Sequence, residues 1–223
     1  MLVAVAVFPG TNCEMDTKYA FEKLGVNVAL VFHKEESLPE GTDLVVLPGG
    51  FSYGDYLRSA AIAKFSPIMK AVIAFANNGG KVLGICNGFQ MLLEAHLLPG
   101  AMKRNQNVHF ISKYQPLKVL NTSNTFLQKF AVGDILNVPI AHGEGNYYID
   151  DAGLKDLYAN NQVLLSYCDA IGNEQNPNGS VDAIACICNK ERNVFGLMPH
   201  PERAIETLLG SDDGVKMLQG FIH

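Results

Sequence analysis

Residues 81–93 read Lys-Val-Leu-Gly-Ile-Cys-Asn-Gly-Phe-Gln-Met-Leu-Leu, and the rest of the fold can be worked out from this stretch. Its first part, Lys81 to Ile85, predicts a buried strand, and the part from Gly88 to Leu97 predicts a helix that ends before Pro99-Gly100. Between them, Cys86 has a glycine two positions away on each side, which matches the pattern G-x-nucleophile-x-G. A strand, a tight turn and a helix in this order are typical of α/β proteins, which expose such a side chain at the carboxyl edge of the sheet.

The segments that precede this stretch repeat the alternation of strand and helix. The continuous apolar run from Leu2 to Phe8 is typical of a strand buried on both faces in a parallel sheet. Further strands are expected at residues 26–32 and 43–47, the last ended by Pro48-Gly49-Gly50. A helix is expected from a cap at Thr11 or Asn12 to Leu24, closed by Gly25, and another from about Leu57 to Asn77.

The pattern changes after residue 107. From Val108 to about Ile149 the periodic segments are short and β-rich, and further strands are expected at residues 163–168, 181–187 and 194–198, the last two joined in a hairpin through polar residues 189–193. A final helix is expected from about Gly214. We therefore predict an α/β fold, a single domain over residues 1–223, with a mostly parallel central sheet flanked by helices and a β-rich second half.

Composition narrows the functional classes. The net charge of −5 with mixed signs argues against nucleic acid or an anionic membrane as the main partner. The apolar start lacks a preceding basic segment and stops at Pro9-Gly10, which indicates no secretory signal. Five cysteines, an odd number, argue against a disulfide framework and favour a reducing cytoplasm. Cys186 and Cys188 form C-x-C, but no second pair or nearby histidine completes a zinc set, so we predict no metal.

Cys86 is the candidate nucleophile. A strand-to-helix turn requires neighbours without bulk and places the sulfur at a helix N-terminus, where the peptide dipoles favour a thiolate. The N–H of Asn87, the next residue, would point toward a developing oxyanion. The alternative is a cysteine packed at a strand end, with glycines that serve only the turn.

The candidate base is His200, in the segment Met-Pro-His-Pro-Glu at residues 198–202. The prolines favour extended backbone, in which residues two apart face the same side, so Glu202 can orient the imidazole of His200. The alternative is a proline-rich strand exit with a surface histidine. His142 is a competing candidate for the base, but no acid is fixed beside it as Glu202 is beside His200. His142 and Glu144 could also bind a metal ion, but they would supply only two ligands.

Two further segments complete the candidate site. Pro48-Gly49-Gly50 follows a predicted strand, and its glycines would let backbone N–H groups approach a substrate closely, although Pro-Gly turns are also common without function. Gln90, on the first turn after Cys86, either faces the site or lies on the helix surface.

These motifs together resemble the class I (triad-type) glutamine amidotransferases, and more closely the glutaminase subunits of phosphoribosylformylglycinamidine synthase (the PurQ type). The elbow around Cys86 and the His200-Pro-Glu202 segment are shared across class I, and two segments are specific to the subunit type. The resemblance spans most of the chain, through residues 8–13, 48–58, 84–90, 141–145 and 196–203.

The resemblance implies a reaction and roles for single residues. Cys86 would form a γ-glutamyl thioester with glutamine, His200 would transfer protons and Glu202 would orient it. The N–H groups of Gly50 and Asn87 would form the oxyanion hole, and Gln90 would contact the substrate. Ammonia would pass to a large ATP-dependent synthetase subunit (PurL type), accompanied by a small bridging subunit (PurS type), in de novo purine biosynthesis. ATP and magnesium would bind on the partner, with no cofactor on this chain, in the cytoplasm.

Two positions depart from the pattern: Ala60 replaces an expected glycine, and Asn146 replaces an expected arginine. They bear on loop geometry or partner contact, and not on the proposed triad. Three alternatives remain open at this point: a cysteine peptidase, a chaperone or deglycase of the related superfamily, and a binding module in which Cys86 is inactive.

Overall fold

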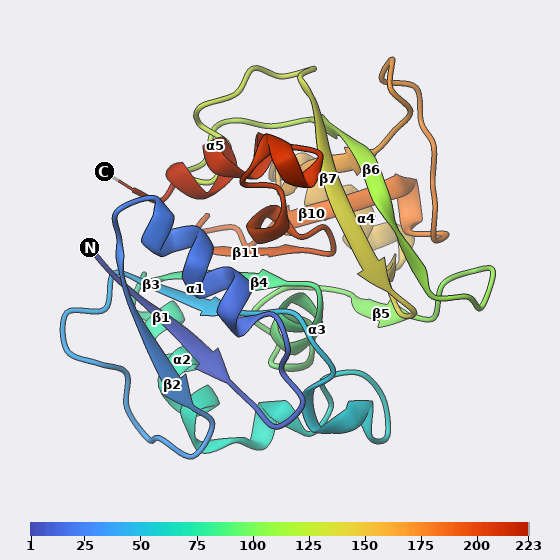
Figure 1. Ribbon diagram of the computed structural model, residues 1–223. Helices are drawn as coiled ribbons and strands as arrows, with labels where there is room; N and C mark the ends of the chain where they lie inside the picture. Colours follow the sequence, from blue (N-terminus) through green and yellow to red (C-terminus); the bar gives the residue numbers. More distant parts are fainter. Residues whose placement is uncertain (223) are drawn as a thin grey trace.

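The computed structural model describes residues 1–222 and contains one large sheet with helices on both faces (Figure 1). In the described residues the sheet has nine strands in the order β2-β1-β3-β4-β11-β10-β9-β6-β7, and β5 and β8 form a separate two-stranded ribbon. The strands from β2 to β11 in this order run parallel, and the remaining neighbours pair antiparallel. The predicted α/β class, with a mostly parallel central sheet and a β-rich second half, is confirmed.

The strands are β1 (Leu2–Val7), β2 (Asn27–Phe32), β3 (Leu44–Leu47), β4 (Lys81–Ile85), β5 (Ala101–Lys103), β6 (Ile111–Val119), β7 (Ile135–His142), β8 (Asn146–Tyr148), β9 (Val163–Tyr167), β10 (Ile184–Cys188) and β11 (Val194–Leu197). The α-helices are α1 (Glu14–Lys23), α2 (Pro67–Asn77), α3 (Asn87–Glu94), α4 (Asp151–Ala159) and α5 (Asp213–Gln219). Short 3-10 turns lie at Ser52–Asp55, Ala63–Phe65, Val181–Ala183, Pro201–Arg203 and Thr207–Leu209.

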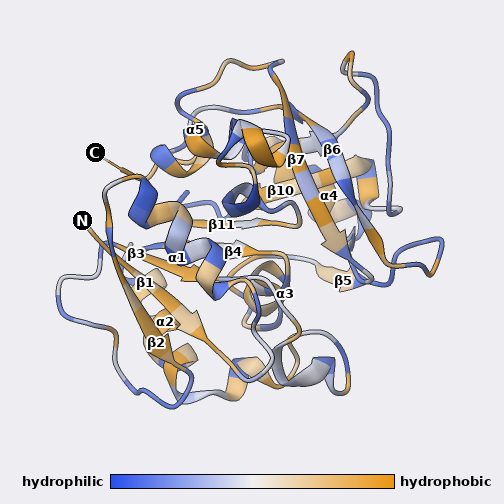
Figure 2. Ribbon diagram, in the orientation of Figure 1, coloured by the Kyte–Doolittle hydropathy of each residue, from blue (hydrophilic) through white to orange (hydrophobic). Residues whose placement is uncertain are grey.

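The core lies between the sheet and its helices. Helix α1 covers one face of the parallel half, and α2 and α3 cover the other (Figure 1). Strand β3 is buried along its whole length and β1 along its four middle residues, and Figure 2 shows both strands as apolar. Burial on both faces explains why these strands are continuous apolar runs in the sequence. Among residues 1–222, no helix combines the length and apolar character needed to cross a membrane.

The register of three neighbouring parallel strands determines where the site forms. Leu47 of β3 lies opposite Gly84 of β4, and Ile85 of β4 lies opposite Leu197 of β11. Because parallel strands end at the same edge, the segments that follow β3, β4 and β11 leave the sheet side by side. Strand β11 also pairs antiparallel with β10, which confirms the predicted hairpin across residues 189–193.

The predicted helix over residues 57–77 is wrong in its first part. Leu57 and Ala60 have φ of 70° and 63°, so the backbone is not helical there, and α2 begins only at Pro67. Ser66 before it is extended, with ψ of 142°, because a residue that precedes proline is driven away from the helical region. Proline then suits the first helical position, where its missing N–H is not needed.

Other boundaries also differ. Helix α1 has Cys13 at its N-cap in place of Thr11 or Asn12, because the Thr11 hydroxyl accepts from the N–H of Phe8 at 3.0 Å. Gly25 closes the helix with φ of 78°, as expected. The predicted strand 181–187 begins as a 3-10 turn and becomes strand only at residue 184. Helix α4 was not predicted, although Asp150 caps it by accepting from Gly153 N at 2.8 Å.

Candidate active site

Cys86 lies at the turn between β4 and α3, in the strained geometry that the elbow pattern predicts. Its φ of 51° and ψ of −105° fall outside the regions that L-residues normally adopt. A Cβ on Gly84 would lie 2.6 Å from the carbonyl oxygen of Gly88, and a Cβ on Gly88 would lie 1.8 Å from the carbonyl oxygen of Leu47. Both glycines are therefore required by close backbone approach, and not only by the turn.

Replacing Gly88 with alanine should destabilise the protein strongly, because the new methyl group would collide with the backbone of β3. We expect the free energy of unfolding to fall by about 3 kcal/mol or more, measured by urea denaturation. Gly143→Ala is the matched control, since a Cβ there meets only Phe110 at an ordinary 3.7 Å. Equal stability of the two variants would contradict this description of the elbow.

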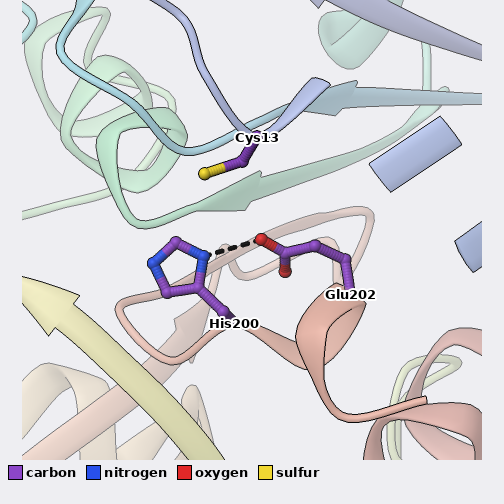
Figure 3. Close-up of side chains that lie close together, drawn as sticks. All are labelled: Cys13, His200 and Glu202. Carbon is purple, nitrogen blue, oxygen red and sulfur yellow. Dashed lines mark hydrogen bonds and ion pairs between the residues drawn. The ribbon is translucent and has the colours of Figure 1, made fainter. Parts of the chain in front are cut away.

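His200 and Glu202 form a buried pair directly after β11. The Nδ1–H of His200 donates to Glu202 Oε1 at 2.6 Å, and the two residues are 1% and 2% exposed (Figure 3). Burial alone would favour the neutral ring, but the negative charges of Glu202 and Cys86 raise the pKa of His200 well above its ordinary value. Because Nδ1 is used by the carboxylate, Nε2 is the nitrogen available for proton transfer. It is buried, and no described residue bonds to it.

Cys86 and His200 line one small cavity of about 80 Å³. This cavity opens toward a second one, of about 280 Å³, with which it shares Gly50, Phe51, Cys86, Phe110 and Ala141. Cys86 is 5% exposed, and its sulfur lies 3.6 Å from the carbonyl oxygen of Ala141. The structure thus brings together the predicted nucleophile and the predicted base at a pocket large enough for an amino acid.

Gly50 also lies on this pocket, with an N–H group that is available. It forms an isolated antiparallel bridge with Thr11, in which the hydrogen bonds come from Asn12 N to Gly49 O and from Phe51 N to Gly10 O. In such a pair the N–H of Gly50 points away from the bridged segment. With φ of 146° and backbone atoms 2.8 Å from any added Cβ, the position accepts only glycine. The N–H of Asn87 is free for a different reason, because it begins α3.

The side chains of Asn87 and Gln90 connect three segments of the site. Asn87 Oδ1 accepts from Ser52 N at 3.0 Å, and its Nδ2 donates to Gln90 Oε1 at 2.8 Å. Gln90 Nε2 donates to the carbonyl oxygen of Glu144 at 2.7 Å, and Gln90 lines the larger cavity. Gln90 therefore faces the site and is not a surface residue. The bridging role of the Asn87 side chain was not predicted, since Ser52 lies in a loop 35 residues earlier in the chain.

Cys13 was also missed by sequence reasoning. Its sulfur points toward the His200 ring from the segment after β1 (Figure 3), and a Cβ on Gly49 would touch both. Arg203, held by Asp16 at 2.9 Å, donates to the sulfur at 3.1 Å. Burial raises the pKa of this thiol. Cys13 therefore packs beside the pair formed by His200 and Glu202.

Within residues 1–222, the one group of side chains close enough to share a metal ion is Cys13, His200 and Glu202, with ligand atoms within 4.8 Å of one another. The direct bond between His200 and Glu202 and the guanidinium of Arg203 on the sulfur occupy these atoms and oppose a cation. Cys186 and Cys188 are buried free thiols. The pair His142 and Glu144 is not part of any such group in the described chain.

His142 has no carboxylate partner and is unsuited to the role of base. Its Nδ1 lies 3.0 Å from Asn105 Oδ1, and its Nε2 lies 3.5 Å from Asn178 Nδ2. Burial, followed by the charge of His200, lowers the pKa of His142 to about 4, so the ring is neutral at neutral pH. Asn105 and Asn178 also bond the backbone of Gly145, which indicates that His142 supports this turn.

A larger cavity, of about 720 Å³, lies at the opposite edge of the sheet, where Met1, Asp43 and Lys81 precede or begin their strands. Its described lining residues include neither a thiol nor an imidazole. Size alone therefore does not identify the reactive site, and the chemistry lies at the carboxyl edge.

The fold and this site are those of a glutamine amidotransferase domain. The chain belongs to the family of CobB/CobQ-like glutamine amidotransferase domains, whose profile matches residues 1–213. It is 67% identical over 223 residues, covering both chains completely, to phosphoribosylformylglycinamidine synthase subunit PurQ of Sulfurimonas denitrificans. It is 58% identical over 222 residues to the same subunit of Campylobacter jejuni, covering 100% of this chain and 96% of the relative.

Two solved structures resemble this chain in fold. The structure of PurLQS from Thermotoga maritima matches with a TM-score of 0.89 and 40% identity, over 99% of this chain and 97% of that one. A putative GMP synthase subunit from Thermoplasma acidophilum matches with a TM-score of 0.64 at 18% identity, over 100% of this chain and 92% of that one, which shows a shared fold alone.

Proposed function

We propose that this chain is the glutaminase subunit of phosphoribosylformylglycinamidine synthase, a carbon–nitrogen ligase of de novo purine biosynthesis. In this role it hydrolyses glutamine to glutamate and ammonia. The observation that carries the proposal is the position of Cys86 at the end of β4 and of the His200–Glu202 pair at the end of β11, which lie in register and meet at one pocket. The identity to PurQ subunits supports the choice of synthase.

The first half of the reaction forms a thioester. The ionised sulfur of Cys86 attacks the side-chain amide carbon of glutamine, and the carbonyl oxygen becomes an oxyanion that accepts from the N–H groups of Gly50 and Asn87. When the carbon–nitrogen bond breaks, His200 Nε2–H supplies the proton that completes ammonia. The raised pKa of His200 suits this step, because the ring enters it protonated.

The second half releases glutamate. His200 is now neutral and removes a proton from a water molecule, which attacks the thioester carbonyl and forms a second oxyanion in the same hole. The carbon–sulfur bond breaks, glutamate leaves, and the Cys86 thiolate and the imidazolium are restored. Glu202 keeps Nδ1 protonated throughout and stabilises the imidazolium, because its carboxylate accepts at 2.6 Å in a buried setting.

The proposal includes partners. Ammonia passes to a large synthetase subunit (PurL type), where ATP and magnesium bind, and a small subunit (PurS type) bridges the complex. The match to PurLQS from Thermotoga maritima supports this set of partners. No cofactor is assigned to this chain, which acts as one amidotransferase domain over residues 1–223. The five free cysteines favour a cytoplasmic location.

The test is a reconstitution of the chain with its large and small partner subunits. We expect glutamate release from glutamine to be coupled to formation of formylglycinamidine ribonucleotide, and to require this chain when glutamine is the nitrogen source. Ammonium salts should replace both glutamine and the chain. Peptide cleavage or glyoxal consumption in place of glutamate release would favour the peptidase or deglycase alternatives and overturn the proposal.

A further inference from the structure

Two carboxylates, Asp55 and Glu144, line the larger cavity but not the smaller one that His200 lines, and the mechanism above does not use them. Asp55 belongs to the loop after β3, and Glu144 to the turn between β7 and β8. Glu144 Oε2 accepts from Ser59 Oγ at 2.6 Å, and its Oε1 lies 3.5 Å from Nε of the mostly exposed Arg104. Asp55 Oδ1 accepts from Asn87 Nδ2 at 3.4 Å, and the backbone N–H of Ala60 also donates to this carboxylate.

Asp55 lacks a positive partner. Among the described residues no lysine, arginine or histidine forms an ion pair with it, whereas Glu144 lies close enough to repel it. Partial burial, followed by the charge of Glu144, raises the pKa of Asp55 to about 6. The other charged or titratable groups that line the cavity are Cys86, Arg104 and His142. A small cation that entered the cavity beside Asp55 would remove the repulsion and restore the ionised carboxylate.

The loop that carries Asp55 is held in place. Tyr53, Asp55 and Leu57 have φ between 53° and 70°, a conformation that costs about 1 kcal/mol or more per residue. The Tyr53 hydroxyl anchors this loop at 2.8 Å from His33 Nδ1 and 2.7 Å from Ser66 Oγ. The carboxylate therefore has a fixed position in the wall of the larger cavity.

The proposed function places a second requirement on this cavity. The amide end of glutamine must reach Cys86 and the unpartnered Nε2 of His200, and His200 lines only the smaller of the two cavities. The α-ammonium group lies at the other end of a short aliphatic chain, and it then falls in the part of the cavity that Asp55 and Glu144 line. A compact ammonium group is the cation that this pair of carboxylates lacks.

We propose that Asp55, together with Glu144, binds the α-ammonium group of the substrate and thereby makes the site selective for a free amino acid over other primary amides. This inference rests on the proposed glutaminase function. It assigns Asp55 a role in substrate specificity, and it gives the two acidic residues a task separate from that of the triad.

The test compares glutamine with glutaramate, which is glutamine without its α-ammonium group, in the reconstituted complex. Asp55→Asn should reduce the ratio of kcat/KM for glutamine to that for glutaramate by about 10-fold or more, through a higher KM for glutamine. Glu144→Gln should shift the ratio in the same direction. Asp151→Asn, on the exposed first turn of α4, is the matched control and should keep the parent ratio.

Two readouts separate this role from a structural one. In the parent, KM for glutamine should rise as the pH falls through about 6, because protonated Asp55 no longer attracts a cation. In Asp55→Asn this rise in KM near pH 6 should be absent. Asp55→Asn should also keep or raise the melting temperature at pH 7.5, since it removes an unpaired, partly buried charge.

An unchanged glutamine-to-glutaramate ratio in folded Asp55→Asn would overturn the inference and leave the glutaminase function intact. If the parent complex does not hydrolyse glutamine, the proposed function itself fails. The two failures are therefore distinguishable.

Discussion

Replacing Cys86 with alanine should lower glutamine hydrolysis by about 10⁴-fold or more, because it removes the sulfur at the elbow on which the thioester is proposed to form. Synthesis driven by ammonium salts should continue in the same complex, since that step bypasses the pocket. Glutamate release measured beside ammonia-driven synthesis distinguishes loss of chemistry from loss of assembly. The fold should tolerate the change, because alanine keeps the Cβ at the elbow and removes only the sulfur.

The matched control is Cys168→Ala, which removes a buried thiol just after β9, in the antiparallel half of the sheet. It should retain the parent rate. A second readout is trapping of labelled glutamine as a covalent adduct after rapid acid quench, expected in the parent and absent from Cys86→Ala. Retained hydrolysis by Cys86→Ala would exclude the thioester mechanism.

Glu202→Gln should lower the rate of glutamine hydrolysis by about 10²–10⁴-fold while the protein remains folded. The amide is nearly isosteric, but it removes the charge that holds the imidazolium. The pH profile gives a sharper readout. The negative charge of Glu202 raises the pKa of His200. Without that charge the ring should lose its proton at lower pH, so the rate should begin to fall at a lower pH on the basic side of the profile.

Glu206→Gln is the control for this variant. Glu206 lies four residues further along and accepts from Lys23 at 2.6 Å at the protein surface, so it carries the same charge without reaching the ring. Its pH profile should match that of the parent. An unshifted basic limb in Glu202→Gln would remove Glu202 from the triad.

The sequence was sufficient to predict that the members of the proposed triad lie near one another, because each member is fixed by local constraints. Glycines on both sides of Cys86 require an elbow. The extended backbone predicted for residues 198–202 is wrong at its end, because Pro201–Arg203 form a 3-10 turn, but the short spacing still keeps Glu202 beside His200. Three strands of strongly apolar character then had to end at one edge. The roles of the site residues in catalysis stay predictions until they are measured.

Long-range pairings could not be predicted in this way. The contacts of Asn87 with Ser52 and of Arg203 with Cys13 join residues far apart in the chain. The non-helical segment before α2 was missed because its composition suits a helix, whereas its backbone includes left-handed residues such as Ala60. That residue lies where the resemblance led us to expect glycine, and its φ of 63° explains the expectation.

The position of β11 in the sheet has a consequence for biosynthesis. This strand is among the last elements of the chain, yet it inserts between β4 and β10, in the middle of the sheet. While a ribosome is still making residues 194–203, β4 is paired with β3 on one side only, and the proposed nucleophile is present without its proposed base. The exposed strand edge is then open to wrong partners. Catalytic competence therefore coincides with closure of the sheet, and an incomplete chain cannot release ammonia.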